Sequence, residues 1–400
     1  MRRLMLVVVL AGMAIPAGAL KRVTEAQLEQ TVAAANSTHK PDAEIAHTIA
    51  GMELSERLSE GALGRLYAKL KPGSRTAQAL ELLADRSAFL DLPASELPAT
   101  AAPDEATQKQ ILEAVRSYVA QTLRKLPNFL ATRTLNRYND SPQEEKKDSW
   151  PVRAGLHLVD TSSQEISVRE ESEGGPGTKG AAVWEERVGL TTAGEFGSTL
   201  GTILADTAQG TLSWSHWEQT PTGLAAVFRY SVPKAASHFE VIGSVQRRTE
   251  LEPVATPIAG RRGIVGIGVQ ASGGGTSNTS IIRTKPGYHG SMWVDPASGT
   301  ILRITMEADP KDSAGFKRAA ILVEYGQVEI GGSRFVCPVR SLALSMAINN
   351  AQASLGDEPT EWLNETLFTG YHHFASTTRI LTDAETPGTG SPADGDEKAK

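Results

Sequence analysis

The spacing of apolar residues divides the chain into two regions with different periods. Across residues 24–126 apolar side chains recur every three or four positions, as in Ile45, Ile49 and Met52, which is the period of a helix buried along one face. From Asn128 onward apolar and polar residues alternate, and β-branched and aromatic residues become common between turn residues, which is typical of strands. The pattern predicts an α+β protein: an N-terminal helical domain followed by a large antiparallel sheet.

Prolines and turn residues divide the chain further. We expect a helical domain over residues 20–92 and a proline-spaced linker with a bridging helix over 93–127. A β domain should cover residues 128–384. Residues 385–400 are polar and rich in proline and glycine, which predicts a disordered tail.

About eleven strands with connections of hairpin length are expected in the β domain, and they imply a strongly curved or partly closed sheet, an open half-barrel. One helix over Gly194–Ala208 interrupts them and should lie against one face of the sheet. The glycine-rich residues 243–280 are expected to form a long loop that gates this face. The strands are expected at residues 129–138, 152–159, 165–169, 181–188, 211–218, 224–231, 289–294, 300–307, 319–330, 333–347 and 363–380.

The first nineteen residues have the three parts of a cleavable signal peptide. Arg2 and Arg3 precede an apolar run over residues 4–15, and Ala17 and Ala19 supply the small side chains of a cleavage site. The apolar run is shorter than a bilayer-spanning helix requires. We therefore expect cleavage after Ala19, a periplasmic or secreted protein, and no transmembrane anchor after cleavage.

The net charge bears on the kind of partner, and the single cysteine on the role of one buried side chain. The formal net charge is −6, whereas proteins that bind nucleic acids concentrate positive charge against phosphates. No nucleic-acid partner is therefore expected. The single cysteine, Cys337, lies in a strand-like segment and is interpreted as a buried structural residue.

The sequence Tyr288–Arg303 contains two alternating strands joined by an Asp-Pro-x-x-Gly turn, in which Asp295 should cap the turn through its own side chain. This hairpin resembles the strand pair of the LolA-like family of periplasmic lipoprotein carriers and their sigma-regulator relatives. The resemblance implies an unclosed antiparallel β-barrel with helices over its open face, which binds acyl chains or lipidated partners in the hollow. The whole chain also resembles a family of exported bacterial proteins in which a helical N-terminal region precedes such a β domain. The segments that carry this second likeness are residues 53–58, 83–90, 126–129 and 370–374.

The few aromatic residues lie mostly in or near alternating strands, where they either form the core of the sheet or line an apolar hollow under the helix over Gly194–Ala208. That hollow is the candidate ligand site. No metal site, cofactor or catalytic group is predicted. His216 and Glu218 share a strand face, and Glu185, Glu186 and Glu324 also lie in strands, but no serine-hydrolase or zinc motif accompanies them. The residues expected to line the hollow are Trp214, Phe228, Trp293, Met306, Phe196 and Leu200.

Three functional hypotheses follow. The first is an exported binding or carrier module that holds a lipid, an acyl chain or a hydrophobic protein segment on the concave face of the sheet. The second is an envelope assembly or sensing protein that contacts a protein partner through its helical domain; an exposed apolar stripe on those helices would favour it. The third is a hydrolase, which a cleft joining His216 or His373 to carboxylates would favour.

Cleavage of the leader can be tested in a Gram-negative expression host. The periplasmic protein should begin at Leu20, as measured by N-terminal sequencing or intact mass. Ala19→Arg should block processing because the cleavage site requires a small residue there, while Gly18→Gln, at the unrestricted middle position, should be processed normally. An Ala19→Arg protein processed like the wild type would contradict the assignment.

Overall fold

The computed structural model confirms the α+β fold class, with N-terminal helices followed by a large antiparallel sheet and one inserted helix. The expected signal peptide, the expected strand over 181–188 and the expected tail lie outside the described residues. The structure describes residues 20–122, 126–141, 155–169, 172–174, 189–190, 195–196, 198–248, 256–258, 266–268, 277–311, 316–347 and 360–373.

Four short helices form the helical region, and three of them begin at a residue whose side chain caps the helix. Thr24 and Gln27 make a reciprocal capping box at the first helix, and Ser59 and Ser74 accept backbone hydrogen bonds at two others, which satisfies donors that a helix start leaves free. Their apolar faces pack together around Leu28, and a two-stranded parallel ladder joins them. The elements are α1 (Glu25–Ser37), α2 (Asp42–Ala50), α3 (Glu60–Tyr67), α4 (Arg75–Ser87), β1 (Lys21–Val23) and β2 (Met52–Leu54).

Ten strands form the main sheet, in the order β5-β4-β3-β17-β16-β15-β14-β13-β8-β7. Every neighbouring pair is antiparallel. Most expected strands match within a few residues, but the two expected at 152–159 and 165–169 form a single strand, β4, that begins at His157. The strands are β3 (Phe129–Asn139), β4 (His157–Arg169), β5 (Ser172–Gly174), β7 (Thr211–Thr220), β8 (Gly223–Val232), β13 (Tyr288–Val294), β14 (Ile301–Ala308), β15 (Phe316–Ile330), β16 (Ser333–Ala347) and β17 (Thr360–His373).

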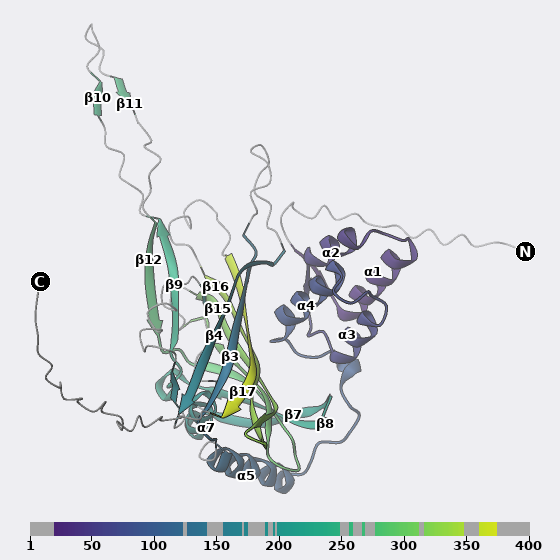
Figure 1. Ribbon diagram of the computed structural model, residues 1–400, viewed down its shortest axis with the longest axis vertical. Helices are drawn as coiled ribbons and strands as arrows, with labels where there is room; N and C mark the ends of the chain where they lie inside the picture. The colour runs from purple at the N-terminus through teal and green to yellow at the C-terminus, as the bar shows by residue number, and fades with distance from the viewer. Residues whose placement is uncertain are drawn as a thin grey trace, which may run out of the picture.

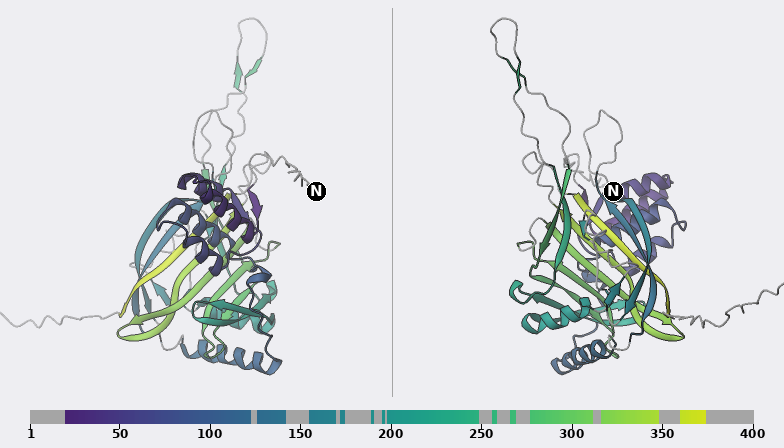
Figure 2. Two further views of the ribbon diagram at one scale, coloured as in Figure 1. Left: turned by 90° about the vertical axis from the view of Figure 1, so that its right-hand side faces the viewer. Right: turned by 60° about the vertical axis from the view of Figure 1, so that its left-hand side comes forward.

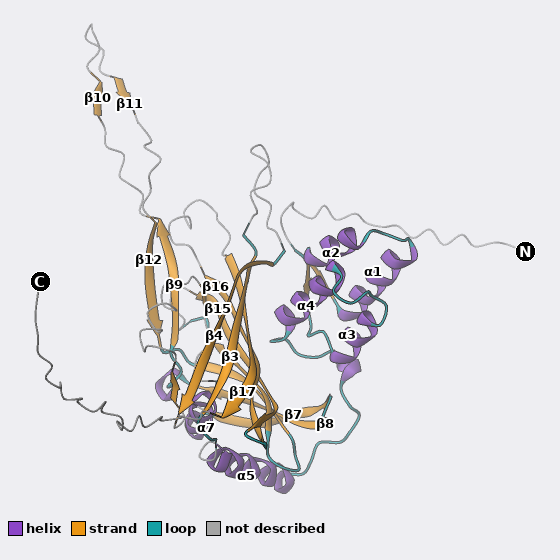
Figure 3. Ribbon diagram, in the orientation of Figure 1, coloured by secondary structure: helices purple, strands orange, loops and turns teal. Residues whose placement is uncertain are grey.

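Helices cover both faces of the central strands, so these strands are buried on both sides. Along β15, Ala319 and Val323 face a core that includes α5 (Glu105–Thr122) and α7 (Ser198–Asp206). The alternate residues Ala320 and Leu322 face the helical region. Figures 1 and 3 show α1–α4 beside the sheet, and α5 and α7 at its lower end, away from α1–α4. Figure 2 shows the same separation of the helical region (purple) from α5 (blue) in two further views.

Helix α5 follows residues 93–104 and packs into the core of the sheet. Val115 is fully buried in the largest apolar cluster. The turn between β13 and β14 rests directly on this helix, because a Cβ atom on Gly299 would lie 2.4 Å from the carbonyl carbon of Ala114. Asp295 caps that turn as predicted: its carboxylate accepts hydrogen bonds from the Ala297 N–H and the Ser298 hydroxyl.

The prediction of a loop over residues 243–280 is wrong at both ends. Val241–Arg248 (β9) and Ser277–Thr284 (β12) pair along eight residues, and β6 (Gly189–Leu190) extends this second sheet to three strands. Between them β10 (Thr256–Ile258) and β11 (Gly266–Gly268) pair with each other. The glycine, serine and arginine content concealed an antiparallel ladder, because backbone pairing does not depend on apolar alternation.

Replacing Gly299 tests the contact between the turn and α5. Gly299 has φ +72° and Gly332 has φ +80°, but a Cβ on Gly332 meets nothing within 4 Å. Gly332→Ala should cost only the left-handed strain, about 1–2 kcal/mol. Gly299→Ala should cost about 1–3 kcal/mol more from overpacking. Urea unfolding measures both, and equal losses would show that the turn does not press on α5.

Candidate functional site

The helical region contacts the sheet through a small apolar patch flanked by ion pairs. Residues near the end of α4, including Ala88, pack on Leu322 and Leu342 of the central strands. On one side of this patch Arg86 forms a bidentate ion pair with Glu361. The Nε–Oε1 distance is 2.8 Å and the Nη2–Oε2 distance is 2.5 Å. This interface joins elements far apart in the sequence, and it leaves two cavities.

The larger cavity, which we call the helix–sheet cavity, has a volume of about 1020 Å³. It lies between α2 and α4 on one side and β3, β4, β16 and β17 on the other. Much of its wall is apolar, and its polar groups include Asp85, Arg340 and Glu365. The apolar wall includes Ile49, Met52, Leu82, Leu156, Leu158 and Leu367.

An ionic triplet marks the end of the helix–sheet cavity. Arg340 lies 2.6 Å from Asp85 and 2.7 Å from Glu365. Burial raises the pKa of Asp85 to about 7, although the charge of Arg340 and its hydrogen bond oppose the rise. Asp85 and Arg340 also line the second cavity, so this pair forms part of the partition between the two spaces.

The second space, which we call the charged cavity, has a volume of about 540 Å³ and lies between α3 and the strands β7, β14 and β15. Besides Asp85 and Arg340, its wall includes the carboxylates of Glu60, Glu96, Glu218 and Glu324 and the guanidinium groups of Arg57 and Arg303. Burial raises the pKa of Glu60, with Glu324 and Glu218 adding to the rise and Arg303 opposing it. Burial also lowers the pKa of Arg303 to about 10, with the nearby charge of Arg57 adding to this effect.

Glu218 is the best-stabilised carboxylate of this group. Burial alone would raise its pKa, but the hydrogen bond to His216 and the charge of Arg57 outweigh burial and lower the pKa to about 2. The Arg57 Nη2–Glu218 Oε2 distance is 2.5 Å, and both side chains are largely buried. Arg57 and Arg303 each stack on the ring of Trp293, at 5.3 and 4.9 Å from its centroid. Glu218 therefore stays ionised at neutral pH.

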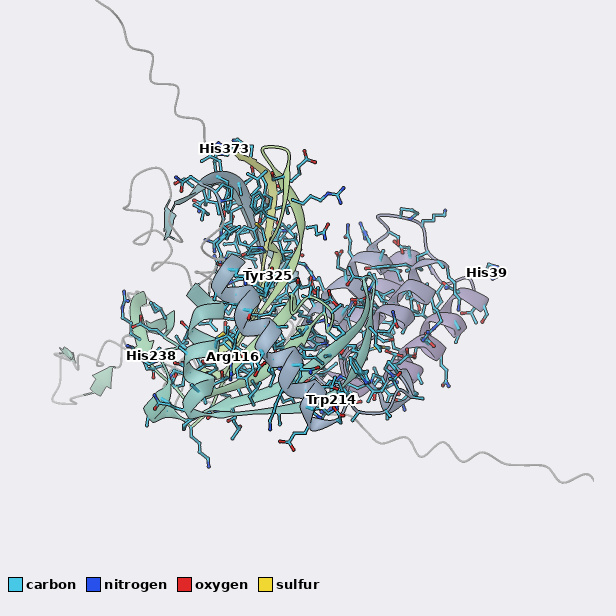
Figure 4. The ribbon with its side chains drawn as sticks, turned by 90° about the horizontal axis from the view of Figure 1, so that it is seen from below. His39, Arg116, Trp214, His238, Tyr325 and His373 are labelled. Carbon is cyan, nitrogen blue, oxygen red and sulfur yellow. The ribbon has the colours of Figure 1, made fainter. Side chains whose placement is uncertain are left out.

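The structure does not bring all six predicted hollow residues together. Phe228, Met306 and Leu200 belong to the core filled by α5, and Trp214 packs at its margin. Figure 4 shows α5, which carries Arg116, lying across the sheet between Trp214 and Tyr325. The space found there, beside Phe196 and Leu200, is a cavity of about 20 Å³, room for about one water molecule.

Two predicted residues lie apart from that core. Phe196 packs against Phe129 and Phe368, with ring centroids 5.5 and 5.0 Å away. Trp293 lies on the opposite face of the sheet, beside the charged cavity, because it pairs with Val227 while its neighbour Met292 pairs with Phe228. Alternation along a strand places such neighbours on opposite faces.

A second buried carboxylate holds three chain segments together. Asp206, at the end of α7, accepts hydrogen bonds from the His238 backbone N–H at 2.8 Å and the Tyr288 hydroxyl at 2.9 Å, and its other oxygen lies 2.6 Å from His238 Nδ1. The His238 ring itself is largely exposed, and Figure 4 places it far from Trp214. This arrangement ties α7 to β13 and to the loop after β8.

Sequence reasoning identified Glu218, Glu324 and His216 as strand residues but missed Arg57, Asp85 and Arg340. The available signal was the presence of charges within otherwise apolar segments, such as Leu83–Leu90, since a charge on a buried face requires a partner. Cys337 is fully buried, as predicted, and burial raises its pKa to about 12. Within the described residues no cluster of three or more His, Cys, Asp or Glu side chains is arranged to hold a metal ion.

No family model, curated protein or solved structure matches the chain. Its class is defined by its own fold, an α+β protein with a helical N-terminal region over one face of a large antiparallel sheet. None of the described helices combines the length and the apolar character needed to cross a bilayer.

Because the Arg57–Glu218 ion pair is buried, breaking it should lower the stability of the fold. Glu218→Gln should destabilise the protein by about 3–5 kcal/mol in chemical unfolding, because it leaves Arg57 buried without its counter-charge. Glu307→Gln, which breaks the more exposed pair with Arg318, should cost less than about 1 kcal/mol. Equal effects would contradict the importance of burial.

The same pair predicts a pH dependence. The folded pKa of Glu218, about 2, lies below its ordinary value of 4.5, so its contribution is present above pH 4.5 and is lost as the pH falls towards 2. The shift corresponds to about 3 kcal/mol. The stability difference between wild type and Glu218→Gln should therefore shrink by about this amount between pH 5 and pH 2, measured by urea unfolding at each pH. A constant difference would contradict the assignment.

Proposed function

We propose that this protein is an exported binding module that holds an amphipathic, acyl-containing ligand in the helix–sheet cavity. The proposal keeps the carrier role that the LolA-like hairpin implies and assigns it to the face of the sheet beneath α2 and α4. The observation that carries it is a cavity of about 1020 Å³ between a helical layer and the strands, which is at the upper end of the volumes of small-molecule sites.

The composition of the cavity wall supports an amphipathic ligand. Ile49, Leu82 and Leu367 offer apolar surface from a helix pair and a strand, and burial of an acyl chain against such surface gives affinity of about 25 cal/mol per Å². The ionic partition of Asp85, Arg340 and Glu365 offers donors and acceptors to a polar head group. A ligand with one apolar and one polar end fits this division.

Exposed apolar side chains at the rim of the helix–sheet cavity support the same proposal. Leu158 lines the cavity and is 55% exposed. Leu158 and Val159 are the large hydrophobic side chains that stand exposed among the described residues, and both lie on β4. Exposed apolar side chains beside a cavity are typical of ligand-binding sites.

The alternative role in protein–protein contacts has less support. The apolar faces of α1–α4 are turned inward around Leu28, Ile49 and Leu80. The described helices carry no large exposed hydrophobic side chain. The exposed apolar stripe that would favour a helical docking arm is therefore not seen on them.

Leu158 and Val159 form a matched pair for the test. Leu158→Glu should abolish binding because it places a charge at the cavity wall, while Val159→Glu, at 48% exposure and outside the lining, should bind like the wild type. Both side chains are exposed enough for the variants to fold. Native mass spectrometry after incubation with vesicles of bacterial phospholipids, followed by solvent extraction, measures the bound species.

The expected result is a stoichiometric acyl-containing species on wild type and Val159→Glu, absent from Leu158→Glu. An apo mass for folded wild type would overturn the carrier role. Equal binding by both variants would show that the ligand lies elsewhere.

A further inference from the structure

A β-bulge near the middle of β7 places two neighbouring polar side chains on one face. Trp214 pairs with Phe228 on the core side, and His216 pairs with Val227 on the side of Trp293, so the register shifts by one residue at Ser215. In a regular strand, Ser215 and His216 would point to opposite faces. The extra residue of a bulge re-aims a side chain and brings Ser215 beside His216.

A continuous set of hydrogen bonds results. Ser215 Oγ lies 2.8 Å from His216 Nδ1, and His216 Nε2 lies 3.4 Å from Glu218 Oε2. An ionised carboxylate can only accept, so Glu218 selects the tautomer with hydrogen on Nε2. The lone pair of Nδ1 is then free to accept the Ser215 hydroxyl hydrogen.

Glu218 is held in place from the other side. Its contact with Arg57 is 2.5 Å, and Arg57 is itself buried against Trp293. The Glu218 carboxylate is therefore a fixed hydrogen-bond acceptor for Nε2 of the His216 ring. Ser215 and His216 remain partly exposed on an edge strand. Nucleophile, base and orienting carboxylate in hydrogen-bond sequence are the parts of a serine nucleophile site, whichever ring nitrogen meets the serine.

We propose that Ser215, His216 and Glu218 form a nucleophilic site that hydrolyses carboxylic esters, separate from the helix–sheet cavity. Ser215 Oγ attacks the ester carbonyl while its proton passes to His216 Nδ1. The carbon–oxygen bond to the alcohol breaks, and His216 gives that proton to the leaving alkoxide. Water then attacks the acyl-serine, losing a proton to His216, which returns it to Ser215 as the acid leaves.

Glu218 is a positioning residue in this scheme, because it touches His216 and not the ester. Arg229 lies on the same face of the neighbouring strand, opposite Ser213, where it pairs with Asp91 at the surface. Esters are the substrate class because their carbonyl is more electrophilic than that of an amide and an alkoxide is a better leaving group than an amide anion.

A fluorophosphonate probe tests the site without a known substrate. The Ser215 oxygen should form a bond to phosphorus with loss of fluoride, and peptide mass spectrometry should place the adduct on Ser215 of the full-length protein. His216→Gln keeps a polar side chain but cannot accept the proton, so the labelling rate should fall by about 10²–10⁴-fold. Hydrolysis of p-nitrophenyl acetate should fall in parallel.

Matched controls separate this activity from other effects. Ser215→Ala should lose the adduct, while Ser213→Ala, two residues away on the same strand, should be labelled like the wild type. Leu158→Glu should also be labelled normally, which keeps a failure of the ligand-binding proposal distinct from a failure here. Absence of an adduct on Ser215, or unchanged labelling of folded His216→Gln, would overturn the proposal.

Discussion

Burial of the central strands on both faces is the constraint on which the rest of this structure depends. In β15 the residues Ala319, Ala320, Leu322 and Val323 alternate between two apolar clusters, so neither face can be left to water. A sheet of this kind needs a covering layer on each side. The chain supplies α5 and α7 on one face and the helical region on the other.

The two coverings differ in how closely they pack. Beneath α5 and α7 the described residues enclose a cavity of about 20 Å³ beside Phe196. Beneath the helical region a small apolar patch carries the contact, and ion pairs of Arg57, Arg86 and Arg340 surround it. Charges removed from water must be paired, and side chains from these pairs line the two cavities on this face. The ligand-sized space and the ionic groups thus lie at the same interface.

The sequence predicted the fold class well because helical and strand periods are local properties. The Asp295 turn and the burial of Cys337 were predicted for the same reason. The face assignment failed for Trp293, since alternation shows that Trp293 and Met292 point to opposite sides but not which layer covers each side. The bulge at Ser215 and the meeting of Asp85 with Arg340 depend on register and on segments 255 residues apart, and a single sequence contains no direct record of either.

The linker also has a consequence for the exposure of one edge of the sheet. Residues 93–104 run from the helical region to α5, and the carbonyl of Ala101 accepts a hydrogen bond from Trp217 Nε1 on the outermost strand β7 at 2.8 Å. Exposed strand edges attract foreign strands and begin aggregation. The segment that connects the two coverings thus also contacts the strand at one edge of the sheet, and detaching it would leave that strand more open to foreign strands.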